Sequence, residues 1–366
     1  MQTKTMTLPD YFKEISDPRV SGRTKHKLTD IIGIAIIAVI AECDEWQDIA
    51  DWAGSKQEEL KKYFKLSNGI PSHDTFERVF SIINPLEFEH CFIQWVKSIL
   101  GSDTTFVHLD GKSLTGSADV PHGKKMLHLV HAWASQQNLL LAQVRTEEKS
   151  NEITAIPELL ALLDLAGCII TIDAMGCQKG IVEKIIEAKA DYILAVKNNQ
   201  KSLYEQIQTA FSHQTIESEN KTEEKNHGRI ETRTCRIITN LDFAEETSNW
   251  KKSQSIIALT RIRTIKEKET TETSYYISSL KKDAAFMNQA VRAHWSVENQ
   301  LHWSLDVAFG EDGSRKRKGH QAQNFATLRR IALNVIKSYK GDKRSIKRRR
   351  KMASYEFSYL QKVLKI

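Results

Sequence analysis

The order of strand-like and helix-like segments from residue 104 onward constrains the fold more than any other feature of the sequence. Strand patterns cover residues 104–110, 126–135 and 139–147, with a turn at 136–138 between the last two. Helix patterns over 154–165, 179–189 and 202–211 then alternate with strand patterns over 168–173 and 192–196. These last two strands are continuously apolar, which is typical of central parallel strands. The order β-β-β-α-β-α-β-α predicts an α/β fold with a ribonuclease H-like core.

Two aspartates follow strands that lie side by side in such a core. Asp110 ends the first strand and is followed by Gly111 and Lys112, and Asp173 ends the fourth. The two carboxylates are therefore expected to converge, where they could share one divalent ion. Each also has an ordinary interpretation, because Asp-Gly is a common turn and aspartate commonly follows a strand.

A third acidic residue, Glu298, lies in the middle of residues 292–306 (RAHWSVENQLHWSLD), a pattern that predicts a continuous helix. At 100° per residue, four side chains fall within about 60° of it: His294, Leu301, His302 and Leu305. The leucines indicate an inward face, where a carboxylate is costly unless it is paired or bound to metal. One interpretation is a buried ion pair with a lysine or an imidazolium. The other joins Glu298 to the two aspartates as three oxygen ligands suited to Mg²⁺ or Mn²⁺.

The net charge of +7 is unevenly distributed along the chain. Residues 313–351 hold fifteen Lys and Arg and one acid, Asp342, and so carry +14, which leaves −7 for the rest of the chain. Basic helices of this kind bind phosphate backbones or anionic membranes, and a solvated helix face is the plain alternative. DNA is favoured because the intervening apolar residues fit a packing role. The candidate DNA contacts in this segment are Arg315, Lys316, Arg317, Lys318, Arg329, Arg330, Arg348, Arg349 and Arg350.

The remaining regions complete the predicted organisation. Helix patterns over 8–15, 29–43, 46–53, 56–64, 73–84 and 86–100 predict an N-terminal bundle. Within it, residues 72–78 could be the recognition helix of a helix-turn-helix, or the bundle could be purely supporting. A charged loop over 217–228 and strand patterns over 229–239, 255–266 and 271–279 predict an antiparallel insertion whose polar and basic faces are available to DNA. The predicted domains are 1–102 (helical), 103–340 (catalytic, with a β-rich insertion at about 217–281) and 341–366 (basic tail).

Nothing in the sequence indicates a membrane or secreted protein. The longest uncharged apolar run, residues 31–41, is shorter than the roughly 18 residues that a membrane-spanning helix needs. The N-terminal residues lack the pattern of a signal peptide, so a cytoplasmic protein is expected. The five cysteines form no C-x-x-C pair and no zinc-type spacing, and are expected to be small core residues.

Five stretches are long and specific enough to compare with known families. They are LDGKSLTGS (109–117), EEKSNEITAIPELL (147–160), TIDAMGCQK (171–179), YILAVKNNQ (192–200) and HWSVENQLHWSLDVAFGED (294–312). They closely resemble the ISAs1-family transposases, which include the H-repeat-associated proteins, and residues 26–52 and 69–85 resemble the helical region associated with them. The resemblance implies an insertion-sequence DDE transposase with Asp110, Asp173 and Glu298 as its acidic triad. It also implies Mg²⁺ or Mn²⁺ as cofactor, and double-stranded DNA (element ends and target) bound by a homo-oligomer.

Other residues near the proposed triad carry weaker signals. Lys112, Lys197 and Asn198 follow strands and are candidate phosphate contacts, with surface polar residues as the alternative. The broader insertion-sequence group has a Tyr-Arg-Glu-Lys signature, at whose places this chain holds Val291, His294, Glu298 and Leu305. His294 could replace the arginine when protonated, or could orient the glutamate by a hydrogen bond.

Two further functions stay open at this point. One is a catalytically inactive, transposase-derived DNA-binding protein. The other is a structure-selective nuclease on the same fold, which would share the metal site and disregard particular DNA ends.

Overall fold

The computed structural model describes residues 8–101, 104–123, 125–146, 152–226, 229–266 and 268–365. Within these ranges one mixed sheet of nine strands forms the centre, in the order β3-β2-β1-β4-β5-β9-β8-β7-β6. The strands are β1 (Phe106–Leu114), β2 (Leu127–Ala134), β3 (Leu139–Thr146), β4 (Ile169–Ile172), β5 (Asp191–Val196), β6 (Ser218–Asn226), β7 (Arg229–Ile238), β8 (Ser255–Ile265) and β9 (Lys268–Ser278). Strands β1, β4 and β5 run parallel, and the other pairings are antiparallel.

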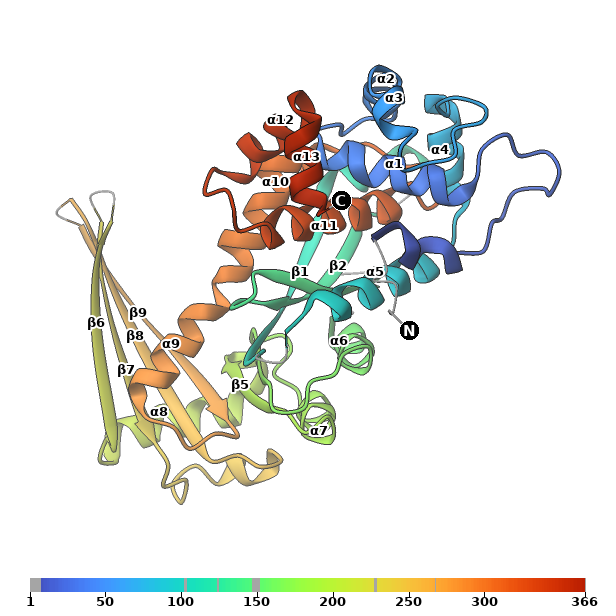
Figure 1. Ribbon diagram of the computed structural model, residues 1–366. Helices are drawn as coiled ribbons and strands as arrows, with labels where there is room; N and C mark the ends of the chain where they lie inside the picture. The colour runs from blue at the N-terminus through green and yellow to red at the C-terminus, as the bar shows by residue number, and fades with distance from the viewer. Residues whose placement is uncertain are drawn as a thin grey trace, which may run out of the picture.

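Most helices lie together at one end of the sheet, where they form a separate layer (Figure 1). The α-helices are α1 (Leu28–Ile40), α2 (Trp46–Ser55), α3 (Gln57–Leu60), α4 (His73–Ile82), α5 (Pro85–Ile99), α6 (Glu152–Ala161), α7 (Lys179–Glu187), α8 (Lys201–His213), α9 (Ala284–His294), α10 (Trp303–Phe309), α11 (Gln321–Ser338), α12 (Ile346–Tyr355) and α13 (Phe357–Leu364). Over the part of the chain described, none of the helices combines the length and apolar character needed to cross a bilayer.

The pairing of β1 with β4 confirms the predicted contact between the first and fourth strands. They pair in parallel, and Leu109 opposite Ile172 is the last pair of their ladder. Asp110 and Asp173 are the next residue of each strand, so they emerge at the same edge. One detail of the prediction is wrong, because β1 does not end at Asp110 but continues to Leu114 against β2.

The predicted insertion extends this sheet. Strand β9 pairs with β5, so strands β6 to β9 project as a long ribbon away from the helical layer (Figure 1). The predicted loop over 217–228 is wrong for residues 218–226, which form strand β6 and pair with β7 along their length. Residues 227 and 228 lie outside the described ranges. The sequence SENKTEEKN hides this strand because β6 is the edge of the sheet, where charged side chains are favoured.

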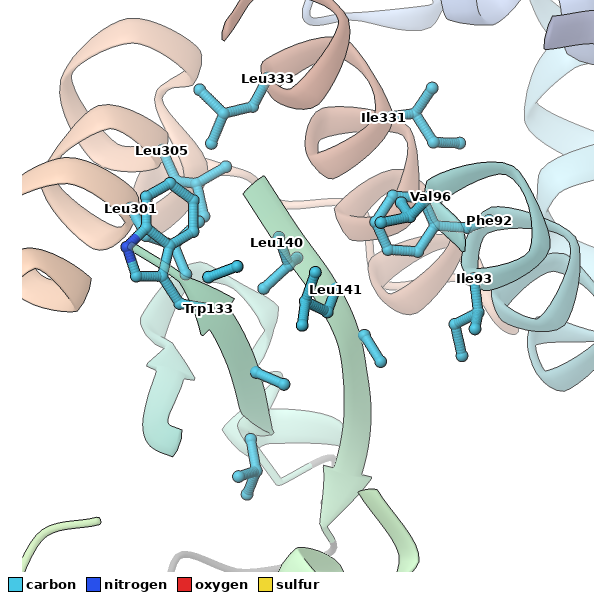
Figure 2. Close-up of a cluster of buried hydrophobic side chains, with 14 of the residues drawn as sticks. Phe92, Ile93, Val96, Trp133, Leu140, Leu141, Leu301, Leu305, Ile331 and Leu333 are labelled. Atoms are coloured by element: carbon cyan, nitrogen blue, oxygen red, sulfur yellow. The ribbon is translucent and has the colours of Figure 1, made fainter. Parts of the chain in front are cut away.

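The N-terminal and C-terminal helices form one helical body. Helices α1, α4 and α5 contact α11, and α1 also contacts α12. Figure 2 shows the core beneath them, in which Phe92 of α5, Ile331 of α11 and Leu140 of β3 belong to one buried cluster. Residues 341–366, which were predicted as a basic helical C-terminus, include the two packed helices α12 and α13. The predicted boundary at 102–103 lies outside the described residues.

Helix α9 joins the two parts of the sheet. Its buried residues Met287, Ala290 and Val291 pack against Phe106 of β1 and Ile257 of β8 in a second core. This packing fixes the end of α9, and with it the segment that carries Glu298.

Candidate functional site

Asp110 and Asp173 are each anchored through one carboxylate oxygen. Oδ1 of Asp110 accepts a hydrogen bond from the backbone N–H of Gly111 at 2.9 Å. Oδ1 of Asp173 accepts from the N–H groups of Met175 at 3.1 Å and Gly176 at 3.3 Å, in a turn that follows β4. Oδ2 of Asp110 lies 3.7 Å from Nδ1 of His302, which is longer than a hydrogen bond.

Glu298 lies in a π-helix, η7 (Val297–His302), between α9 and α10. The prediction of a regular helix through residues 292–306 is therefore wrong at its centre. A π-turn holds more residues than an α-turn, so the face shared with Leu301 and Leu305 is broken. Both leucines are buried as predicted, whereas Glu298 is exposed. Among the described residues its carboxylate has no hydrogen bond or ion pair, which removes the buried ion pair interpretation.

The three acidic residues line the same two cavities. The larger cavity, about 850 Å³, lies against β4, β5, β8, β9 and α9 and is also lined by Lys197 and Asn198. The smaller, about 630 Å³, is also lined by Glu152 and His302. Asp110, Asp173 and Glu298 belong to both linings, although they come from three separate segments of the chain.

The electrostatics of these cavities suit a divalent cation. Burial, and after it the negative charge of Asp173, raises the pKa of Asp110 to about 7. Burial also raises the pKa of Asp173, and the charge of Glu152 adds to this effect. Carboxylates that repel one another in a shared cavity are the hard oxygen donors that Mg²⁺ and Mn²⁺ prefer. In the described part of the chain no three potential ligands are close enough to hold a metal as they stand, so an ion would have to draw the carboxylates together.

Glu152 is a fourth acidic residue of the site that sequence reasoning did not single out. It begins α6 and is 5% exposed. Its Oε1 lies 2.6 Å from Nε2 of His128, whose Nδ1 lies 2.8 Å from Oγ of Ser113 on β1. The available signal was its place in the family-like stretch 147–160, of which residues 147–151 lie outside the described ranges.

Of the four polar residues predicted near the triad, two lie at the larger cavity and two have their side chains bonded inside the protein. Lys197 and Asn198 are exposed on its lining. Lys112 is 8% exposed and donates to Oδ2 of Asp306 at 2.8 Å. His294 lies 2.8 Å from Oγ1 of Thr171 through Nδ1, and burial lowers its pKa to about 4. His294 is therefore neutral near pH 7 and is hydrogen-bonded to Thr171, where a bond to Glu298 was one of the predictions.

The basic C-terminal segment divides into buried and exposed cations. Arg350 donates from Nη2 to Oδ1 of Asp44 at 2.8 Å and to the backbone oxygen of Val39 at 2.9 Å. Arg330 is paired with Glu311, and both are buried. Six of the predicted DNA contacts are 8% exposed or less: Lys112, Lys316, Arg329, Arg330, Arg349 and Arg350. That prediction is corrected for these six, because their side chains bond or pack inside the protein.

The other predicted cations remain accessible. Arg315, Lys318 and Arg348 are exposed, and Arg317 is partly exposed while it donates from Nε to the backbone oxygen of Gly116 at 3.1 Å. The five cysteines are all buried and carry free thiols, as predicted.

Comparisons with known proteins point to one family. Residues 95–335 match the family model described as "Transposase DDE domain", and residues 9–96 match the model described as "DDE_Tnp_1-associated". The chain is 42% identical to "Putative transposase YncI" of Escherichia coli O157:H7, over 98% of this chain and 94% of that protein. It is 39% identical to "H repeat-associated putative transposase YhhI" of Escherichia coli (strain K12), over 98% and 97%.

A likeness to a solved structure is much weaker. The cryo-EM structure of a piggyBac transposase synaptic complex with hairpin DNA is 13% identical, with a TM-score of 0.45, over 97% of this chain and 77% of that chain. At this TM-score the likeness supports no inference about the site.

Proposed function

The chain belongs to the DDE transposase family, and from that premise we propose that it is an insertion-sequence transposase that cuts and joins DNA strands at the ends of its element with Mg²⁺ or Mn²⁺. One observation carries the proposal: Asp110, Asp173 and Glu298 line the same two cavities. The strand order β3-β2-β1-β4-β5 supports a ribonuclease H-like core beneath them.

We assign the acidic residues as the ligands of the metal site. The charges of Asp173 and Glu298 both raise the pKa of Asp110, so Asp110 is the residue that would be shared if two ions were bound. Asp173 and Glu298 would each complete one ion's ligand set. A divalent ion held by these residues would supply activation of the attacking water or 3′-hydroxyl and stabilisation of the leaving oxygen.

The protein groups around the site are proposed to position the DNA strand. The backbone N–H groups of Gly111, Met175 and Gly176 donate to one oxygen of each aspartate and so orient the two carboxylates. Lys197 and Asn198 at the larger cavity are proposed to contact the phosphates beside the cut. The exposed cations Arg315, Lys318 and Arg348 are proposed to add nonspecific affinity for the DNA backbone. We also propose that the protein acts as a homo-oligomer on DNA.

The test separates binding from cleavage. Wild type and Asp173→Asn are compared on a plasmid that carries the element's own ends, with Mg²⁺, strand-cleavage assays and gel shifts. Asn keeps the size of Asp and removes the charge that holds a cation. Asp110→Asn and Glu298→Gln are parallel variants, and Asp242→Asn, at an exposed position outside both cavity linings, controls for the loss of one charge.

We expect the three site variants to bind the ends and not to cut them, while the control cuts as wild type does. Wild type that binds the ends and never cuts them with any divalent ion would establish the inactive DNA-binding alternative. Wild type that cuts unrelated DNA equally well would establish the nuclease alternative.

A further inference from the structure

A chain of polar side chains connects the interior of α11 to the carboxylate of Asp110. Nη2 of Arg330 lies 3.3 Å from Nε2 of His131 on β2. Nδ1 of His131 lies 3.1 Å from Nε2 of His302 at the end of the π-helix, and Nδ1 of His302 lies 3.7 Å from Oδ2 of Asp110. Arg330 and His131 are completely buried. Four separate elements of the fold are thus linked through this chain.

The start of the chain is fixed by a buried ion pair. Nη2 of Arg330 donates to Oε2 of Glu311 at 2.9 Å, and Nη1 donates to the backbone oxygen of Ala326 at 3.0 Å. Glu311 is 1% exposed. Because the guanidinium is planar and held on two sides, the direction in which it faces His131 is set by the core.

The arginine also determines where the ring protons lie. A guanidinium only donates, so Nε2 of His131 must accept and the proton of His131 must be on Nδ1. That proton is donated to Nε2 of His302, which leaves the proton of His302 on Nδ1. If His302 were doubly protonated, its Nε2–H would point at Nδ1 of His131, which already carries a proton. The contacts therefore select one tautomer at each ring.

We propose that His131 and His302 are positioning residues for Asp110, held in their tautomers by Arg330 so that the Nδ1–H of His302 is aimed at Oδ2 of Asp110. The backbone N–H of Gly111 holds Oδ1 of the same carboxylate. The contact from Gly111 is a hydrogen bond, whereas the 3.7 Å contact from His302 is longer than one and acts on Oδ2 electrostatically. The expected effect of His131 and His302 on DNA cleavage rests on the proposed function. The tautomers of the two rings can be measured whether or not the protein cuts DNA.

The rate of DNA cleavage should depend on where the side chain of residue 302 places its N–H donor. In His302→Asn the side-chain amide can place an N–H near the former Nδ1, whereas in His302→Gln it lies near the former Nε2. Loss of a partner that orients a metal ligand typically lowers activity about 10- to 100-fold. We expect that loss for His302→Gln and for His131→Phe, with His302→Asn retaining most of the cleavage rate. His213→Asn, at an exposed position in α8, is the matched control and should be unaffected.

The decisive readout is the tautomer, measured by NMR on the full protein labelled with ¹⁵N-histidine, without DNA or metal. The signals of His302 are identified by their absence in His302→Asn. We expect the Nδ1–H form in wild type, opposite to the Nε2–H form that prevails in free neutral histidine, and a shift toward Nε2–H in His131→Phe.

Three results would overturn the proposal. They are an Nε2–H or doubly protonated His302 in wild type, an unchanged tautomer in a folded His131→Phe, and equal cleavage by His302→Gln and wild type. Should His131→Phe fail to fold, the wild-type tautomer and the two His302 variants still decide. If wild type never cuts the element ends, the proposed function fails. The tautomer of His302 in wild type then still tests whether Arg330 and His131 orient His302.

Discussion

A β-carbon at Gly111 would lie 2.7 Å from the carboxylate carbon of Glu152. It would also lie 2.8 Å from Nε2 of His128, the partner of that carboxylate. The glycine after Asp110 is thus the point at which a buried His–Glu pair approaches β1. The close approach of the His128–Glu152 pair explains why position 111 is a glycine. An Asp-Gly turn does not explain it, because β1 continues through Gly111 as a strand.

The first prediction follows from this contact. In Gly111→Ala the added methyl group must displace the His128–Glu152 pair, and such overpacking typically costs about 1–3 kcal/mol. We expect the free energy of unfolding, measured with urea, to fall by that amount, and DNA cleavage to fall with it. The control is Gly54→Ala in α2, where a β-carbon would meet nothing within 4 Å and where helix propensity favours alanine. An unchanged stability in Gly111→Ala would contradict the contact.

The second prediction concerns Glu89 of α5, whose pKa burial raises to about 7. Its carboxylate accepts from Nε2 of Gln143 on β3 at 2.8 Å and from Oγ1 of Thr327 on α11 at 3.1 Å. The unfolded chain loses this proton near pH 4.3 and the folded chain near pH 7, so the contribution of Glu89 to stability falls across that window by roughly 4 kcal/mol and then levels off.

Urea unfolding of wild type and Glu89→Gln at pH 5 and pH 8 isolates this contribution. Other groups titrate in the same range, because the pKa of Asp110 is raised to about 7 and that of His294 is lowered to about 4, so the quantity to compare is the difference between the two proteins at each pH. Because the amide is uncharged at both values, the stability of wild type relative to Glu89→Gln should fall by roughly 3 kcal/mol from pH 5 to pH 8. The stability of wild type relative to the exposed Glu183→Gln should not change. An unchanged difference between wild type and Glu89→Gln would contradict the prediction.

The third prediction separates exposed cations from buried ones. The logarithm of DNA affinity falls with the logarithm of salt by about 0.9 per phosphate contact. Replacing the exposed Lys347 and Arg348 by glutamine should therefore make the slope shallower by about 1 to 2, in gel shifts between 50 and 200 mM salt. The control replaces the exposed Lys61 and Lys62 of the N-terminal helices. If the salt slope became equally shallow in both variants, the N-terminal helices would also have to contact DNA.

The sequence predicted the parts of the fold that depend on local pattern. The apolar strands β4 and β5 and the helices α1, α2, α4 and α5 lie close to their predicted ranges, because hydrophobic periodicity and Gly or Pro boundaries are local signals. Helix α3 is shorter than the predicted 56–64. The convergence of Asp110 and Asp173 followed from strand order alone.

The sequence did not reveal features set by distant partners. Arg350 and Arg330 were assigned to a basic surface because their acidic partners, Asp44 and Glu311, do not lie beside them in the sequence. The edge strand β6 has no apolar alternation to mark it. The π-helix at Glu298 depends on how α9 and α10 pack, and a helical wheel drawn at 100° per residue cannot represent it.

The central claim, one metal site shared by three acidic residues, is tested most directly by Mn²⁺ binding. Electron paramagnetic resonance of Mn²⁺ titrated into wild type, Asp110→Asn, Asp173→Asn and Glu298→Gln measures binding without any requirement for activity. Each substitution removes one carboxylate, so we expect all three variants to bind Mn²⁺ more weakly than wild type, by about tenfold or more. Wild-type affinity in Glu298→Gln would contradict the account, because the third ligand would then have to come from another residue.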